Sequence, residues 1–200
     1  MEDTKMIARV GDLNIKVKKK GFTLIEVLIV ISILGIVMIP LSNFFFTNYK
    51  ALNEVSKQVD LQSEGEKAIK KIVDFAIGSK GILEVKKGAE DLSRKTNGGN
   101  IDRIVFKTVD DSGSDLYEIF EVADNKLWHG TSGDSNKIID KDGSLSANEV
   151  SGMVIAENIQ VVNLGASESF INADGVKLII VLSKDKVTSS VESEVYFRNK

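Results

Sequence analysis

The 200-residue sequence contains no cysteine, one proline, one histidine and one tryptophan. The lack of cysteine excludes disulfides, thiolate zinc sites and thiol nucleophiles together. An extracytoplasmic domain of this chain must therefore be stabilised by packing alone. The single histidine, His129, has no neighbouring triad or metal-site pattern, so we find no catalytic constellation and expect neither an enzyme nor a cofactor.

The sequence also lacks a large excess of positive or negative charge. The formal net charge is -3, with 28% charged and 42% hydrophobic residues. This composition is ordinary for a globular domain with a usable core. No broad basic field is present, so nucleic-acid binding by the whole chain is not indicated.

Hydrophobic residues are concentrated in one run, from Phe22 to Phe46. The run exceeds the roughly 20 residues that a helix needs to span a membrane. Lys16, Lys18, Lys19 and Lys20 precede it and predict a cytoplasmic N-terminus and an extracytoplasmic C-terminal part. A cleaved secretory signal is disfavoured because no small-x-small pattern follows the run. A plain signal anchor remains an alternative.

One carboxylate, Glu26, interrupts the apolar run. A charge within a membrane span costs a few kcal/mol, so it usually marks a function or a partner. Glu26 could simply reach the cytoplasmic headgroups. Alternatively, cleavage after Gly21 would give Phe22 a charged amine, and this amine on one subunit could neutralise Glu26 on a neighbour.

The segment from Lys18 to Ile36 (KKKGFTLIEVLIVISILGI) resembles the processing and transmembrane signature of type IV prepilins and type II secretion pseudopilins. The resemblance implies cleavage by prepilin peptidase between Gly21 and Phe22, N-methylation of Phe22, and a role for Glu26 in assembly. It assigns Lys18, Lys19 and Lys20 to the basic end of the leader. The leader is longer than in many pilins, and Pro40 lies earlier than the helix proline of many major pilins.

Apolar residues recur every three or four positions after the span, from Tyr49 to Ala76, and predict an amphipathic helix to about Ile77. Gly78 and Gly81 supply a C-terminal stop. Pro40 should kink or locally melt this helix. The expected parts are a leader (1–21), a transmembrane and assembly half of the helix (22–46), an amphipathic half (47–78) and a β-rich globular head (79–200).

The head has strand and turn patterns. We expect strands at 101–109, 116–123, 126–129, 159–164, 176–182 and 190–197, with loops at 86–100, 130–152 and 165–174. The apolar run 178–182 predicts a central strand. The fold class is α+β: a long N-terminal helix packed on an antiparallel β-sheet head, as the resemblance to the type IV pilin fold implies.

Short segments of the head also resemble J-type minor pseudopilins and W-type minor pilins. These segments are NKLW at 125–128, IAENI at 155–159, VKL at 176–178 and YFRN at 196–199. The order of the segments favours a minor over a major subunit.

A few remaining residues have competing interpretations. Asp140, Asp142 and Glu149 are candidate calcium ligands, and some pseudopilins carry a loop calcium. Their spacing is two residues short of an EF-hand, so we expect a tight Asp-Gly turn and assign no metal. We expect His129 at the surface of a strand end, Trp128 in the core and residues 44–46 (FFF) at the membrane interface.

Two hypotheses of function follow. The first is a minor (priming or tip) subunit of a type IV pilus, or of a type II secretion or competence pseudopilus. Its partners would be other pilins, prepilin peptidase, the inner-membrane assembly platform and membrane lipid. It would reside in the cytoplasmic membrane with its head outside, and then at the cell surface. The alternative is a monomeric, signal-anchored extracellular domain that binds a ligand.

Overall fold

The computed structural model describes residues 21–198, so residues 1–20, with Lys18, Lys19 and Lys20, lie outside it. One helix, α1 (Leu24–Gly78), precedes twelve strands. By its internal contacts the chain divides into two units, one up to Tyr49 and one from Lys50 onward, and α1 contributes to both.

The helix begins directly after Thr23 and stays helical through Pro40, so the local melting expected at this proline is not seen. It ends at Gly78, one residue beyond Ile77. The hydroxyl of Ser79 donates a 2.8 Å hydrogen bond to the carbonyl of Ala76 and so satisfies one carbonyl of the last turn. Gly81 follows with φ of +121°, a conformation that glycine adopts readily.

Six strands form one antiparallel sheet, in the order β2-β1-β4-β5-β6-β9. Their bounds are Ile82–Lys87 (β1), Glu90–Asp91 (β2), Arg103–Val109 (β4), Asp115–Ala123 (β5), Lys126–Ser132 (β6) and Met153–Ala156 (β9). Asp124 and Asn125 connect β5 to β6 with φ of 51° and 58°, as a two-residue type I′ hairpin requires.

Four strands form a second antiparallel sheet, in the order β12-β11-β10-β3. They are Asn97–Asn100 (β3), Ile159–Gly165 (β10), Gly175–Lys184 (β11) and Val187–Tyr196 (β12). β11 is paired on both sides, as the apolar run at 178–182 predicted. Its buried side chains alternate with half-buried or exposed ones, because only one face of the sheet meets the core.

Two expectations about the head are wrong. We expected one sheet, and the structure has two main sheets. The expected loop at 86–100 contains β2 and β3, and the expected loop at 130–152 contains the end of β6 and a two-stranded parallel ribbon of β7 (Ile138–Asp140) and β8 (Glu149–Ser151). These strands are short, and glycine and asparagine dominate β3, which hides them from a pattern based on strand propensity.

The ribbon covers the outer face of the six-stranded sheet. Ile139 meets Val105 and Ile119 in a small second core, with Trp128 and Val150 packed against it. Trp128 is only partly buried, and among residues 21–198 its indole Nε1 has no hydrogen-bond partner.

Arg103 fixes the ribbon to this sheet. Its guanidinium donates 2.8 Å hydrogen bonds to the carbonyls of Ser135 and Lys137, which lie just before β7. It also pairs with Glu84, at 2.7 Å, and with Glu121. One buried cation therefore joins β1, β4 and β5 to the start of the ribbon.

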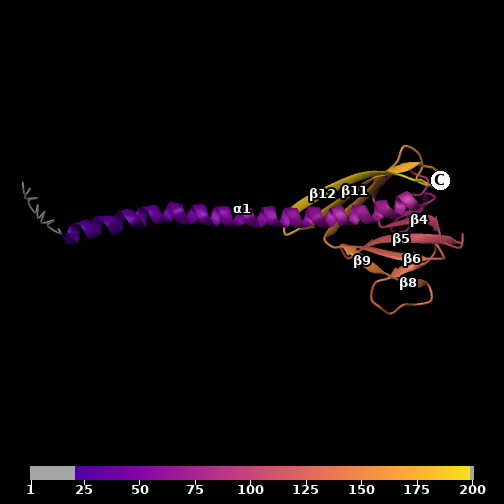
Figure 1. Cartoon of the computed structure of the whole chain (residues 1–200), viewed down its shortest axis with the longest axis horizontal. Helices are drawn as coiled ribbons and strands as arrows, with labels where there is room; N and C mark the ends of the chain where they lie inside the picture. The colour runs from indigo at the N-terminus through magenta and orange to yellow at the C-terminus, as the bar shows by residue number, and fades with distance from the viewer. Residues whose placement is uncertain (1–20, 199–200) are drawn as a thin grey trace, which may run out of the picture. The chain divides into compact units, whose positions relative to one another are not determined.

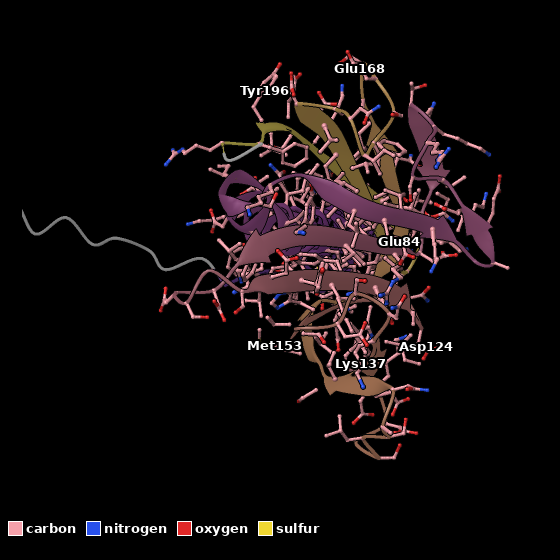
Figure 2. All side chains as sticks on the ribbon, turned by 90° about the vertical axis from the view of Figure 1, so that its right-hand side faces the viewer. Glu84, Asp124, Lys137, Met153, Glu168 and Tyr196 are labelled. Atoms are coloured by element: carbon pink, nitrogen blue, oxygen red, sulfur yellow. The ribbon has the colours of Figure 1, made fainter. Side chains whose placement is uncertain are left out.

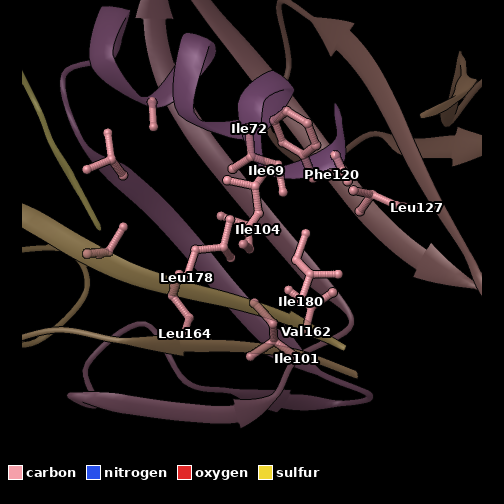
Figure 3. Packing of buried hydrophobic residues seen from close by; sticks show 14 of the residues in the cluster. Ile69, Ile72, Ile101, Ile104, Phe120, Leu127, Val162, Leu164, Leu178 and Ile180 are labelled. Atoms are coloured by element: carbon pink, nitrogen blue, oxygen red, sulfur yellow. The ribbon is translucent and has the colours of Figure 1, made fainter. Parts of the chain in front are cut away.

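The main core lies between the two sheets and the C-terminal part of α1. Leu61, Ala68, Ile69, Ile72 and Ala76 supply the buried face of the helix. Figure 3 shows Ile69 and Ile72 beside residues of both sheets, among them Ile104 and Phe120 of the six-stranded sheet and Leu178 and Ile180 of the four-stranded sheet. Figure 1 shows β11 and β12 on one side of this part of α1 and β4, β5 and β6 on the other.

Gly65 permits a close approach of α1 to the four-stranded sheet. A Cβ at this position would lie 2.7 Å from Cδ1 of Leu182 and 2.8 Å from Cγ2 of Val191. Both distances are below van der Waals contact, so a larger residue would force α1 away from β11 and β12.

Candidate functional site

The predicted cleavage site lies just before the first turn of α1. Gly21, Phe22 and Thr23 are not helical, and all three are exposed. The side chain of Phe22 is 86% exposed, and nothing lies within 4 Å of a Cβ built on Gly21. The peptide bond between Gly21 and Phe22 is therefore open to a protease in the described chain.

Glu26 is held by a capping box with Thr23. The backbone N–H and the hydroxyl of Thr23 both donate 2.9 Å hydrogen bonds to Oε2 of Glu26. The N–H of Glu26 in turn donates a 3.3 Å bond to the hydroxyl oxygen of Thr23. This reciprocal pattern satisfies donors that the helix start leaves without partners. The carboxylate of Glu26 thus has hydrogen-bond donors within its own chain.

The apolar half of α1 presents its side chains outward. Residues 21–50 are all exposed. This helix is long and apolar enough to cross a membrane. Two of its polar side chains bond to the preceding turn: Ser32 donates a 2.8 Å hydrogen bond to the carbonyl of Leu28, and Asn48 donates one of 2.8 Å to the carbonyl of Phe44. Such bonds to the preceding turn lower the cost of a polar group in lipid.

A second apolar surface continues past the membrane run. Leu52, Val55 and Val59 are 69%, 58% and 59% exposed, and we call them the outer stripe. At about 100° per residue they lie within roughly 60° of one another. The buried residues of α1, from Leu61 to Ala76, centre roughly 120° away around the helix. The outer stripe therefore faces away from the protein's own core.

Polar contacts fix the orientation of this half of α1. Lys57 pairs with Asp185, in the β11–β12 turn, at 3.0 Å. Glu64 accepts hydrogen bonds from the N–H of Glu157 and, at 3.3 Å, from the amide of Asn158, both between β9 and β10. These contacts hold the outer stripe away from the head.

The expected surface position of His129 is wrong. β6 continues to Ser132, so His129 lies inside a strand and is buried. Its Nε2 lies 2.6 Å from Oε2 of Glu118, and its ring stacks on Phe75 of α1 with centroids 4.6 Å apart. Thr131 donates a 2.9 Å hydrogen bond to the same oxygen of Glu118. This buried hydrogen-bonded pair and the ring contact join α1 to the six-stranded sheet, which is a structural role.

The candidate calcium ligands Asp140 and Glu149 accept hydrogen bonds from backbone N–H groups within turns. Oδ1 of Asp140 accepts hydrogen bonds from the N–H groups of Asp142, at 3.0 Å, and Gly143, at 2.8 Å. Oε2 of Glu149 accepts one from the N–H of Ser146 at 2.8 Å. Within the described range 21–198, no three His, Asp or Glu residues gather in a group that could hold a metal ion. The carboxylates of this loop are thus engaged by backbone donors.

Residues 16–42 match the family described as the prokaryotic N-terminal methylation motif. The matched segment contains the basic run, Gly21, Phe22 and Glu26, and it ends within α1. No curated protein matches the chain.

The matched motif is the N-terminal methylation signature of type IV prepilin-like proteins, and the match covers only the N-terminal part of the chain. The helix followed by antiparallel sheets gives the α+β class and is consistent with the type IV pilin fold.

Proposed function

We propose that this protein is a minor subunit, at the priming complex or tip, of a type IV pilus or of a related secretion or competence pseudopilus. Prepilin peptidase cuts the chain between Gly21 and Phe22, and the new amine of Phe22 is methylated. The subunit then joins other pilins through α1. The match to the methylation motif supports the first two steps, and the shape of α1 supports the third.

The exposed apolar residues of the outer stripe are the main support for assembly with other subunits. Lipid can cover the apolar residues up to Phe46, but Leu52, Val55 and Val59 lie beyond the expected span and away from the core. Full burial of each such side chain is worth about 1.5–3 kcal/mol. A solitary membrane anchor has no use for this surface, whereas helices of neighbouring subunits would cover it.

Glu26 connects processing to assembly. In the uncut chain its carboxylate accepts two hydrogen bonds from Thr23, which stabilise the charge without neutralising it. Cleavage creates the amine of Phe22 at the same end of the helix. In lipid, an amine of one subunit and Glu26 of its neighbour attract each other strongly because the local dielectric constant is low. The pair would select neighbours that have been processed.

The choice of a minor subunit rests on the resemblance of the head to J- and W-type proteins. The proposed location is the cytoplasmic membrane, with the basic leader in the cytoplasm and the head outside, followed by the cell surface. The assembly platform of the inner membrane would extract the subunit from lipid into the filament.

N-terminal mass spectrometry of the protein from its native membrane tests the proposal, with and without active prepilin peptidase. We expect N-methyl-Phe22 only with the peptidase. Gly21→Val should block the cut, because the motif requires a small residue there. Gly11→Val places the same substitution inside the leader and should leave the cut intact. An intact leader in the wild type would refute the processing step.

Photocrosslinking separates a filament subunit from a monomeric anchored domain. A benzophenone amino acid at position 55 should give adducts with other N-methylated pilins in sheared surface fractions. The same probe at position 54, next to it but roughly 100° around the helix, is the control. Equal yields at the two positions, or no pilin adducts at position 55, would contradict assembly through the outer stripe.

A further inference from the structure

A hollow lies on the outer face of the four-stranded sheet, which points away from the main core. Its volume is about 550 Å³, within the range of small-ligand sites. A neighbouring hollow of about 530 Å³ shares Gly165, Ala166 and Lys177 with it. Together they form one trough, which crosses β3, β10, β11 and β12.

The trough exists because one side chain is missing from a row across the sheet. Asn97 of β3 pairs with Gly165 of β10, which pairs with Lys177 of β11, which pairs with Glu194 of β12. Paired residues of antiparallel strands lie on the same face. Gly165 therefore leaves a gap between an amide and an ammonium group, and nothing lies within 4 Å of a Cβ built there.

Tyr196 forms a flat wall at one end of the trough. A Cβ on Gly175 would lie 2.6 Å from Cδ1 of Tyr196, so the ring covers this glycine. An aromatic ring packed over a glycine of the neighbouring strand can stabilise a sheet without any ligand. Tyr196 nevertheless remains 65% exposed, so its ring is also accessible to a ligand. Its hydroxyl donates a 2.7 Å hydrogen bond to Oε1 of Glu194, which fixes the carboxylate beside the ring. Figure 2 shows Tyr196 and Glu168 on the side of this sheet that faces away from the six-stranded sheet.

The polar groups around the gap are both donors and acceptors. In the described part of the chain, the side-chain amide of Asn163 forms no hydrogen bond. Lys177 pairs with Glu192 at 3.0 Å, so the one cation of the row is balanced by acidic neighbours. This balance disfavours phosphate ligands. Strand addition by an extended peptide is disfavoured at the gap itself, because β10 and β11, which hold Gly165 and Lys177, are paired on both sides and the free edges belong to β3 and β12.

We propose that this trough binds a carbohydrate, with one pyranose ring over Gly165 and a second sugar against the ring of Tyr196. Amide, ammonium and carboxylate groups can form hydrogen bonds with sugar hydroxyls, which both donate and accept. The C–H groups of a sugar can pack against the face of an aromatic ring. The hydrogen bond to Glu194 raises the pKa of Tyr196 and keeps its hydroxyl protonated. The site does not depend on cleavage or assembly and would serve a filament tip or an anchored domain equally.

A glycan array tests the site, with the full mature chain in phospholipid nanodiscs and without glycoside detergents. The array carries oligosaccharides of hexoses, N-acetylhexosamines and uronic acids, and the best binder is then titrated. Tyr196→Ala should weaken binding about tenfold, through lost stacking and a freed carboxylate. Tyr196→Phe keeps the ring and should weaken binding less.

Gly165→Leu fills the gap and should abolish binding. Gly133→Leu is the control, because a Cβ built on Gly133 also has nothing within 4 Å, and Gly133 lies outside the trough. Equal thermal midpoints of the two variants would show that both remain folded. Binding of no glycan by the wild type, equal binding by Gly165→Leu, or capture of peptides in place of glycans would overturn the proposal.

Discussion

Replacement of Arg103 by methionine should destabilise the head strongly and release the ribbon of β7 and β8. The side chain of Arg103 is 9% exposed and that of Glu121 is 8% exposed. The substitution leaves Glu121 paired with the more exposed Lys141 and removes the hydrogen bonds to two carbonyls. Breaking a buried ion pair costs about 3–5 kcal/mol, and each unsatisfied buried group costs about 1–3 kcal/mol. We expect a loss of about 3–5 kcal/mol, since water can reach part of this site.

Calorimetry of the mature chain in nanodiscs should show a melting temperature lower by roughly 6–20 °C. Hydrogen exchange should accelerate in residues 133–152 more than in β11. Arg94→Met is the control, because Arg94 is exposed, and it should change the free energy of unfolding by less than about 0.5 kcal/mol. A loss below about 1 kcal/mol, or unchanged exchange in the ribbon, would refute the role of Arg103 as the link between ribbon and sheet.

Three further predictions concern α1. Thr23→Ala should speed hydrogen exchange in the first turn of the uncut chain, because it removes a cap worth about 1 kcal/mol. Thr23→Ser keeps the hydroxyl and should preserve the protection. Equal exchange in the two variants would argue against the capping box. Gly65→Val should lower the free energy of unfolding by about 1–3 kcal/mol through overpacking. Adding Leu182→Ala to the same chain should recover part of this loss, as measured by thermal unfolding. If the losses from the two substitutions simply added, the close approach would be contradicted. The hydrogen bond from Lys57 lowers the pKa of Asp185, so its stabilising contribution should be present above the ordinary value of 3.8 and be lost as the pH falls through the lowered pKa. The difference in melting temperature between wild type and Asp185→Asn should accordingly shrink on acidification, and a difference that grows would contradict this pairing.

The sequence was most informative where apolar spacing is regular over many residues. The run from Phe22 and the spacing up to Ala76 predicted a helix whose end lies one residue from the observed one. The apolar run at 178–182 and the asparagine-containing turn before β6 also predicted strands that the structure contains. In each of these segments local propensity and burial favour the same conformation.

The rest depended on contacts between distant segments. β3 (NGGN) has almost no propensity for a strand and exists because β10 pairs with it. His129 is buried because Phe75, far away in sequence, covers it. The division into two sheets follows from pairings that no local pattern specifies. By contrast, the role of Thr23 could have been predicted, because Thr-x-x-Glu is the spacing of a capping box.

The separation of the two faces of α1 has a consequence for the energetics of leaving the membrane. Exchange of lipid contacts for helix contacts yields little free energy, because acyl chains are as apolar as the side chains that replace them. Leu52, Val55 and Val59 are exposed beyond the expected span, so in the proposed filament their coverage by neighbours would be driven by the hydrophobic effect. During filament assembly, most of the favourable free energy would therefore come from burying these side chains outside the membrane. Moving the membrane-spanning segment from lipid to neighbouring helices would change the free energy little.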